Sequence, residues 1–284
     1  MRWPILLAAA LGLACAGAAA PAPAPAPSAP AAKPFAPSRF SVVVQGAGPD
    51  VILIPGLTGS REVWKGTVAA VPGYRYHLLQ VAGFAGTAAR GNAQGEVVAP
   101  LAGEVARYIR SRGLRRPAIV GHSMGGTVAM MVAARNPGLA GRVMVVDMLP
   151  QPAGIVGGDA AGMRGLADSL RGLSSTPSGR RLVESAIRLF GNPEGGADPD
   201  VTARATHELA LTDLTPELPR IAAPLTVVYA SLDPSRRAAD DARYRAAYRG
   251  KPGAKLVRID DSGHMIMYDQ PARFRSELKR FLGQ

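Results

Sequence analysis

Residues 118–135, AIVGHSMGGTVAMMVAAR, contain a single serine, which lies among glycines at the point where an apolar run meets a helical pattern. The run Ala118–Gly121 predicts a buried strand and Met124–Asn136 predicts a helix, which leaves Ser123 in the turn between them. Glycine weakens strands and helices alike, so its clustering here indicates a turn too tight for larger side chains. The sequence GHSMG matches the G-x-S-x-G turn, which exposes a serine hydroxyl at the carboxyl end of a sheet on a strained backbone. A purely structural glycine turn is the alternative.

A serine hydroxyl becomes an effective nucleophile only when a base removes its proton. Of the four histidines, only His264 lies in a loop between a predicted strand and a predicted helix, at the same sheet edge as Ser123. His77 lies within a predicted strand, where a buried structural histidine is expected, and His207 belongs to a long insertion, from which it would line a pocket. His122 directly precedes the serine and is expected to point elsewhere in so tight a turn. His264 is therefore the predicted base.

An acid is needed to fix the tautomer of the imidazole and to stabilise its protonated form. Asp233 follows the penultimate predicted strand by a short loop, so the chain order is Ser, Asp, His, the order that accompanies the G-x-S-x-G turn in one hydrolase fold. Asp147, which ends the strand in VMVVDMLP, is the rival acid, and a structural cap is its other interpretation. Asp260 and Asp261 are expected to shape the loop that carries His264. Asp233 is the predicted third member of the triad.

An oxyanion that develops on a substrate carbonyl needs preorganised N–H donors. The turn at Ser123 supplies one of them, the backbone N–H of Met124. The second is expected from the loop after an early strand, in VILIPGLTGSREVW, residues 51–64. There Gly56 lets the backbone turn, and the N–H of Leu57 is expected to face the serine.

Short apolar runs alternate with helix-length segments from Phe40 onward. This alternation predicts the α/β class, with a doubly wound, mostly parallel sheet. The predicted strands are Phe40–Gln45, Val51–Ile54, Tyr76–Gln80, Ala118–Gly121, Val143–Asp147, Leu225–Ala230 and Lys255–Ile259. The predicted helices are Gln94–Ser111, Met124–Asn136, Asp240–Tyr248 and Pro271–Leu282.

Residues 148–223 interrupt this rhythm because they contain no convincing strand. Apolar residues recur there at helical spacing in two places, which predicts a helical cap packed over the end of the sheet. The first set is Met163, Leu166, Ala167 and Leu170, and the second is Val183, Ala186, Ile187 and Phe190. Leu166, Leu170, Ile187 and Phe190 are candidates for lining a substrate pocket, although most are expected to pack the cap against the sheet.

The chain from about Phe40 to Leu282 resembles serine hydrolases of the α/β-hydrolase superfamily, the esterase-like members with a helical cap. The segments PGLTGSREVW, GHSMGG, SLDP and SGHMIMYDQP carry the resemblance, in the order of the family. One departure is Pro55-Gly56, which stands where the family usually has His-Gly, so the oxyanion loop lacks the hydrogen bonds of that histidine. Serine rather than aspartate at position 123 argues against the dehalogenase and epoxide-hydrolase branches.

The N-terminus has the three parts of a secretory signal peptide: a charge at Arg2, an apolar stretch too short to span a membrane, and an Ala-x-Ala site at Ala16-Gly17-Ala18. We therefore expect a signal peptide over residues 1–18 and an exported protein, periplasmic or secreted. Lipid attachment at Cys15, the single cysteine, is the competing interpretation. A Pro/Ala-rich linker is expected over residues 19–38, and the hydrolase domain, with its cap at about 148–223, over residues 39–284.

The formal net charge is +12, but the arginines are scattered in ones and twos without interleaved aromatic residues. We therefore expect no nucleic-acid partner. A basic surface is compatible with weak association with an anionic envelope surface, although a generally basic, solvated surface is the favoured interpretation of the charge. No His/Cys/Asp cluster has the spacing of metal ligands, and no dinucleotide fingerprint or P-loop occurs, so no metal and no cofactor are expected.

These observations predict a carboxylic ester hydrolase that acts by acyl transfer on a small molecule, with an apolar acyl group expected. In it Ser123 attacks, His264 is the base, Asp233 orients the imidazole, and the amides of Leu57 and Met124 bind the oxyanion. Carbon–carbon bond hydrolases and cofactor-free haloperoxidases of the same fold are alternatives. A ligand-binding receptor is the non-enzyme alternative, against which the complete triad argues. The sequence does not predict the oligomeric state, or the acyl and alcohol groups of the substrate, which pocket shape determines.

Overall fold

The computed structural model describes residues 35–154, 160–179 and 196–284. The predicted signal peptide, Cys15 and most of the predicted linker lie outside the described residues. The compact unit begins at Phe35, a little before the predicted boundary at residue 39. Ser38 already belongs to it, because its backbone N–H and its hydroxyl both donate to the carboxylate of Glu104.

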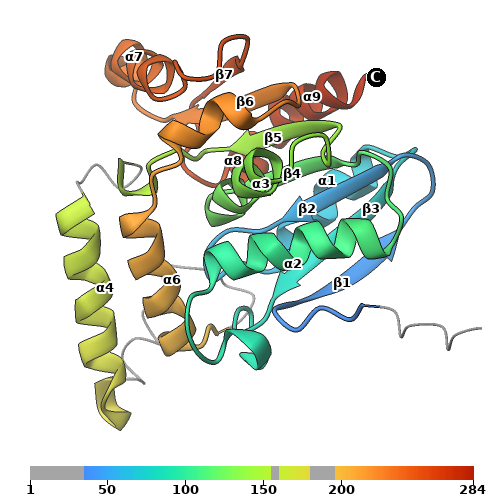
Figure 1. Ribbon diagram of the computed structural model, residues 1–284. Coiled ribbons are helices and arrows are strands. Elements are labelled where there is room, and N and C mark those ends of the chain that lie inside the picture. The colour runs from blue at the N-terminus through green and yellow to red at the C-terminus, as the bar shows by residue number, and fades with distance from the viewer. Residues whose placement is uncertain (1–34, 155–159, 180–195) are drawn as a thin grey trace, which may run out of the picture. The chain divides into compact units, whose positions relative to one another are not determined.

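Seven strands form one sheet within the described residues, in the order β1-β3-β2-β4-β5-β6-β7 (Figure 1). All neighbours are parallel except β1, which pairs with β3 in the antiparallel sense at one edge. The predicted strands are all confirmed, with ends that differ by at most one residue. They are β1 Phe40–Gln45, β2 Asp50–Ile54, β3 Arg75–Val81, β4 Ala118–His122, β5 Arg142–Val146, β6 Leu225–Ser231 and β7 Lys255–Asp260.

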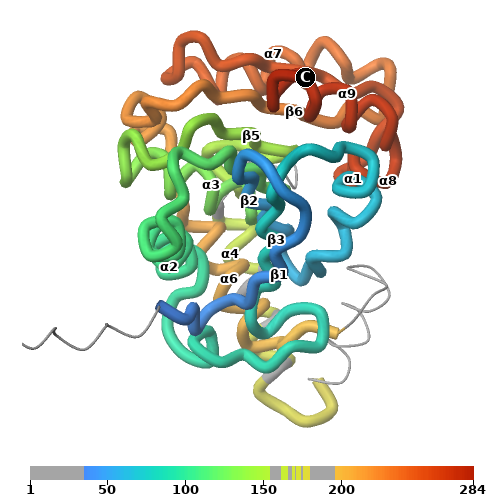
Figure 2. Tube along the Cα trace, turned by 90° about the vertical axis from the view of Figure 1, so that its right-hand side faces the viewer, coloured from blue at the N-terminus to red at the C-terminus, as the bar shows by residue number. Residues whose placement is uncertain are grey.

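Helices cover both faces of the sheet, as Figures 1 and 2 show. Because successive side chains of a strand point to opposite faces, Ile52 and Ile54 belong to one apolar core while Val51 and Leu53 belong to the other. The first core includes side chains of α2 Val98–Ser111, α3 Met124–Arg135 and α7 Arg237–Ala247. The second core includes η1 Arg61–Trp64, α8 Ile266–Asp269 and α9 Pro271–Leu282, with α1 Lys65–Ala70 beside it.

The helix α3 is buried on all sides, from Met124 to Ala134. Its sequence MGGTVAMMVAAR is apolar around the whole circumference, which is the pattern of a central helix rather than a surface one. Its N-terminus follows Ser123 directly, so the most rigidly packed helix of the domain carries the candidate nucleophile at its start.

The insertion after β5 is helical in its described part, as predicted. It contains η3 Pro152–Gly154, α4 Ala160–Ser174, α6 Pro199–Leu211 and η4 Thr215–Arg220, and α4 and α6 lie side by side. Met163, on α4, is buried. The side chains of Leu166 and Leu170, and residues Ile187 and Phe190, lie outside what the structure describes. None of the described helices has the length and apolar composition needed to cross a membrane.

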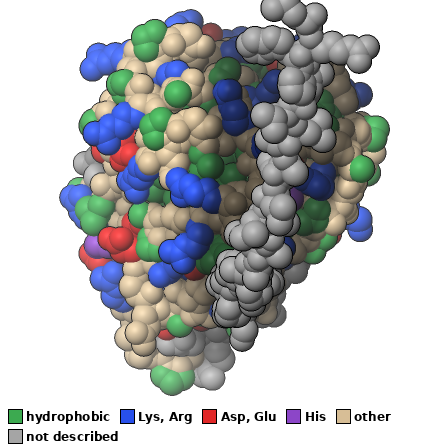
Figure 3. All heavy atoms as spheres, turned by 45° about the vertical axis from the view of Figure 1, so that its right-hand side comes forward, with side chains coloured by type: hydrophobic (Ala, Val, Ile, Leu, Met, Phe, Trp, Pro, Cys, Tyr) green, Lys and Arg blue, Asp and Glu red, His purple; other side chains and the backbone are tan. Residues whose placement is uncertain are grey.

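The surface of the domain is rich in cationic side chains. Figure 3 shows a face on which Lys and Arg side chains are widely spread and acidic side chains are few. The described acidic residues are frequently engaged in structural contacts, as Glu104 and Asp50 are.

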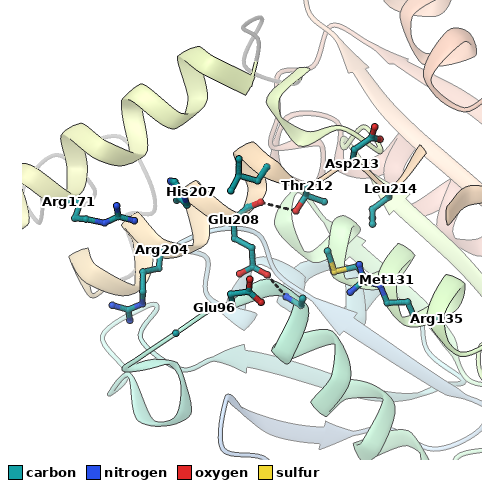
Figure 4. A pocket seen from close by; sticks show the side chains of 13 residues that line it. Glu96, Met131, Arg135, Arg171, Arg204, His207, Glu208, Thr212, Asp213 and Leu214 are labelled. Atoms are coloured by element: carbon teal, nitrogen blue, oxygen red, sulfur yellow. Dashed lines mark hydrogen bonds between the residues drawn. The ribbon is translucent and has the colours of Figure 1, made fainter. Parts of the chain in front are cut away.

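One carboxylate ties the cap to the first core. Glu208 on α6 accepts hydrogen bonds from the backbone N–H groups of Val97, Val98 and Ala99, each at 2.7 Å. These are amides at the start of α2, which have no partner within their own helix, and the helix dipole favours a negative charge there. Figure 4 shows Glu208 extending from α6 to the first turn of α2. The helical insertion is therefore anchored to the core by a carboxylate that caps the N-terminus of α2.

We expect Glu208→Gln to lower the free energy of unfolding by about 2 kcal/mol, because one amide oxygen cannot replace a carboxylate that accepts three hydrogen bonds. Urea denaturation monitored by circular dichroism measures this change. The matched control is Glu217→Gln, which removes a more exposed pair with Arg135 and should cost less than about 1 kcal/mol. Equal losses in the two variants would contradict the anchoring role.

Candidate active site

The turn at Ser123 has the backbone that the glycines predicted. Ser123 adopts φ 54° and ψ −124°, a conformation that strains any residue other than glycine. A Cβ atom at Gly121 would overlap the carbonyl oxygen of Gly125, and one at Gly125 would overlap the carbonyl oxygens of Ile54 and Pro55. Only glycine fits at these two positions because strand β4, helix α3 and the end of β2 meet there.

Backbone hydrogen bonds hold this strained turn. The N–H of Ser123 donates to Val146 O of the neighbouring strand at 2.9 Å. The carbonyl of Ser123 accepts from the N–H groups of Gly126 at 2.7 Å and Thr127 at 3.2 Å, which starts α3. The serine is thus fixed between the end of β4 and the first turn of a buried helix.

The predicted oxyanion loop lies against this turn. A Cβ atom at Gly56 would be 3.0 Å from Ser123 Cβ, so the loop passes as close to the serine as a glycine allows. Among the described residues, the amides of Leu57 and Met124 donate to no protein acceptor. Met124 directly follows the serine and Leu57 lines the same cavity as the serine, so both amides remain candidates for an oxyanion site.

Gln80 supports the oxyanion loop in which Pro55 replaces the usual histidine. Its Oε1 accepts from the N–H of Arg61 at 3.0 Å, and its Nε2 donates to Gly59 O at 3.2 Å and to Phe84 O at 3.3 Å. The side chain is buried at the end of β3. A glutamine on the adjacent strand therefore fixes the loop from outside.

His264 is held by an acid. Its Nδ1 lies 2.7 Å from Asp147 Oδ2, and because a carboxylate only accepts, Nδ1 carries the hydrogen and Nε2 is left as the acceptor. The other oxygen of Asp147 accepts from the N–H of Ala230 at 3.0 Å and from the hydroxyl of Tyr244 at 2.9 Å. Asp147 is nearly buried, with 10% of its side chain exposed, while His264 is 40% exposed.

The predicted contact between Asp233 and His264 is wrong, and Asp147 takes its place. Asp233 is exposed, and its carboxylate accepts from the N–H and hydroxyl of Ser235, which holds the pKa of Asp233 below its usual value. It is the N-cap of the short helix η5 Pro234–Arg236. The physical reason is local, because an Asp followed by Pro and Ser satisfies the start of a helix. The carboxylate of Asp233 is therefore bonded there and not to His264, although the residue still lines the larger cavity at Ser123.

His122 has a contact that the sequence did not predict. Its Nε2 lies 3.0 Å from the carbonyl oxygen of His264, and the two rings lie 4.7 Å apart. Since a carbonyl only accepts, Nε2 of His122 donates and the ring is neutral. Burial, with the neighbouring His264 as a second cause, lowers the pKa of His122 to about 3. His122 therefore holds the loop that carries the predicted base.

The other two histidines lie away from Ser123. His77 is buried in β3 and bonds the Tyr108 hydroxyl and Asp50, as expected for a structural histidine. His207 lines a separate cavity of about 570 Å³ at the base of the cap, where Figure 4 shows it near Arg171 and Arg204. Neither histidine has contact with the candidate nucleophile.

Two cavities meet at Ser123 and His264, which line both. The larger, of about 660 Å³, extends under the cap and is mostly apolar, with Met148, Met163 and Leu209 in its wall. The smaller, of about 360 Å³, lies between the oxyanion loop and Tyr268. A bond held at Ser123 would thus have room for one group on each side. In the described part of the chain, no three His, Cys, Asp or Glu side chains come together as a metal site would need.

Comparison with known proteins identifies the family of the chain. The alpha/beta hydrolase family model matches residues 51–277. The chain is 26% identical over 266 residues to the pimeloyl-[acyl-carrier protein] methyl ester esterase of Vibrio atlanticus, covering 84% of this chain and 96% of that protein.

Solved structures of low sequence identity share the fold. A thermophilic esterase from Thermogutta terrifontis superposes with a TM-score of 0.68 at 21% identity, covering 86% of this chain and 92% of that one. The enol-lactonase of Burkholderia xenovorans superposes with a TM-score of 0.64 at 20% identity, covering 86% and 96%.

We expect the stability of the protein to fall on acidification through His122. Its pKa is about 3 in the folded protein and near 6.5 in the unfolded chain, so as pH falls the unfolded chain takes up the proton first. Between pH 7 and pH 5 this costs about 2 kcal/mol of folding free energy. The variant His122→Gln should lose that much less over the same interval, measured by urea denaturation at the two pH values. His207→Gln, at a partly exposed histidine, is the control, and an unchanged pH dependence in His122→Gln would refute the assignment.

Proposed function

Because the chain belongs to the alpha/beta hydrolase family, we propose that it is a serine hydrolase that cleaves carboxylic esters through an acyl-enzyme intermediate. The observation that carries the proposal is the Asp147–His264 contact beside a serine on a strained turn, all lining one apolar cavity. The esterases and the lactonase among the similar proteins support an ester bond as the target.

In the proposed reaction, Ser123 Oγ attacks the ester carbonyl carbon while Nε2 of His264 takes its proton. The negative oxygen of the tetrahedral intermediate accepts hydrogen bonds from the amides of Leu57 and Met124. Asp147 holds the tautomer of His264 and stabilises the imidazolium. The intermediate collapses as the C–O bond breaks, and His264 gives the proton to the departing alcohol. Water, activated by the same imidazole, then releases the acid and restores Ser123.

The two cavities suggest how the ester lies. The larger, apolar cavity suits the acyl group, because apolar surface there replaces water around a hydrocarbon chain. The smaller cavity, which the oxyanion loop borders, suits the alcohol group. The substrate class that follows is an ester of an aliphatic acid with a small alcohol.

The direct test is covalent labelling with a fluorophosphonate together with hydrolysis of p-nitrophenyl esters of increasing acyl length. We expect the wild-type chain to be labelled and to turn over, and Ser123→Ala to lose labelling and at least roughly 10⁴-fold in kcat. The matched control Ser111→Ala, on the far end of α2, should retain both. Amide, lactone and diketone substrates run beside the esters identify the reaction class, and turnover of a diketone without an ester would refute the ester assignment.

The second test compares substitutions of the two candidate acids, Asp147 and Asp233. Asp147→Asn keeps the shape of the side chain but favours the wrong imidazole tautomer, so we expect kcat to fall by roughly 10²- to 10⁴-fold with little change in KM. Asp233→Asn is the matched control and should stay within a few-fold of wild type, because among the described residues its carboxylate is bonded to Ser235 and not to His264. Steady-state kinetics of both variants at one pH, with circular dichroism as a check on folding, decide between the acids. A near-normal Asp147→Asn enzyme would exclude Asp147 from the triad.

A further inference from the structure

A group of exposed arginines lies at the amino edge of the sheet, where β3 and β4 begin. The chain has no Asp or Glu between Glu104 and Asp147, and the last turns of α2 and the loop into β4 are rich in arginine. We name this surface the basic face. It consists of Arg75, Arg107, Arg110, Arg112, Arg115 and Arg116, all of them exposed.

Little negative charge offsets the basic face. Asp50 is 12% exposed in its side chain and is already bonded by Arg75 and His77. Glu104 accepts from Ser38 and the N–H of Arg39. Within the described ranges, neither Arg115 nor Arg116 forms an ion pair or a side-chain hydrogen bond. Arg75 is paired with Asp50 and Arg110 donates to Asn136, so the charge available to a partner comes mainly from Arg112, Arg115 and Arg116.

The basic face contains two hollows bordered by arginine. One, of about 350 Å³, is lined by Arg75 and Arg112 together with Pro37, Val42 and Val44. The other, of about 300 Å³, is lined by Arg115, Arg116 and Arg142. Each is large enough for a single anionic headgroup. Guanidinium groups match the geometry of phosphate oxygens well.

An exposed aliphatic side chain adjoins the first hollow. Val44 on the edge strand β1 lines it and is 49% exposed, although valine is usually buried. Arginines beside exposed apolar side chains are typical of surfaces that contact the headgroup region of a bilayer. The aromatic ring of Tyr108 is buried, and Phe35 lies under the guanidinium of Arg107, so neither offers a stacking platform for nucleic-acid bases.

We propose that the basic face binds anionic phospholipid headgroups at the surface of a bilayer, with Val44 at the level of the headgroups. Arg115 and Arg116 precede β4 while Ser123 follows it, so the lipid-binding edge and the catalytic edge are opposite ends of one strand. Binding by this face leaves the cavity at Ser123 open to water. The proposal concerns a surface separate from the candidate active site and does not depend on the ester reaction.

The test is cosedimentation of the full chain with vesicles of phosphatidylcholine alone or with phosphatidylglycerol. All proteins carry Cys15→Ser, so that no attached lipid contributes. We expect binding to phosphatidylglycerol vesicles that about 0.5 M salt abolishes, and weak binding to phosphatidylcholine. The triple variant Arg112→Gln/Arg115→Gln/Arg116→Gln should bind on the order of 100-fold more weakly, since each arginine at an anionic surface contributes about a factor of five.

A charge-matched control separates this surface from net charge alone. Arg220→Gln/Arg245→Gln/Arg249→Gln removes the same charge from exposed positions around η4 and α7 and should bind vesicles like the wild type. Equal loss in the two triple variants, or no loss in the first, would overturn the proposal. So would an outcome in which duplex DNA binds through Arg112, Arg115 and Arg116 while vesicles do not. Thermal unfolding of each variant confirms that it is folded.

Discussion

The strained backbone at Ser123 is the constraint on which the rest of the candidate site depends. A serine at φ 54° keeps its conformation only because its N–H is bonded to β5 and its carbonyl starts α3. That geometry brings β4, α3 and the end of β2 so close together that Gly121 and Gly125 admit no side chain. The same closeness brings the loop at Gly56 against the serine. The positions of the candidate nucleophile, its two candidate oxyanion donors and the central helix therefore all depend on the same close packing.

The acid and the imidazole of the candidate site are held by elements outside this turn. Asp147 follows β5 directly and has its own left-handed backbone, φ 49°, which directs its carboxylate to the loop after β7. Tyr244 on α7 and the N–H of Ala230 hold the carboxylate, and Tyr244 stacks on Tyr229. Burial and the nearby Asp147 raise the pKa of Tyr244 well above its usual value, so its hydroxyl remains a donor. The acid is thus fixed by two elements, β6 and α7, that are distant from it in sequence, which explains how one carboxylate keeps an imidazole in a single tautomer.

Short patterns in the sequence predicted the features of this structure that depend on residues close together in the chain. The seven strands follow from apolar runs, and the glycine pair at the turn follows from sterics. The sequence predicted Asp233 rather than Asp147 beside His264. Both acids follow a strand at the same edge of the sheet, and spacing alone does not say which carboxylate reaches the imidazole. The Asp-Pro-Ser start of η5 was the available signal against Asp233. The contacts of Gln80, His122 and Glu208 join segments far apart in the chain, so no sequence window contained them.

The placement of charge has a consequence for how substrate reaches the serine. Strand β4 is five residues long, about 17 Å at the usual rise, and it separates Arg115 and Arg116 from Ser123. This separation exceeds the Debye length of about 8 Å at physiological ionic strength, so the basic face barely influences charges at the catalytic edge. The cavity under the cap has a mostly apolar wall, but Asp233, Arg236, Asp240 and Arg243 also line it, so any charge that acts near the serine comes from the cavity's own lining rather than from the basic face. Under the two proposals, the surface that binds anions and the cavity that receives the acyl group are therefore separate.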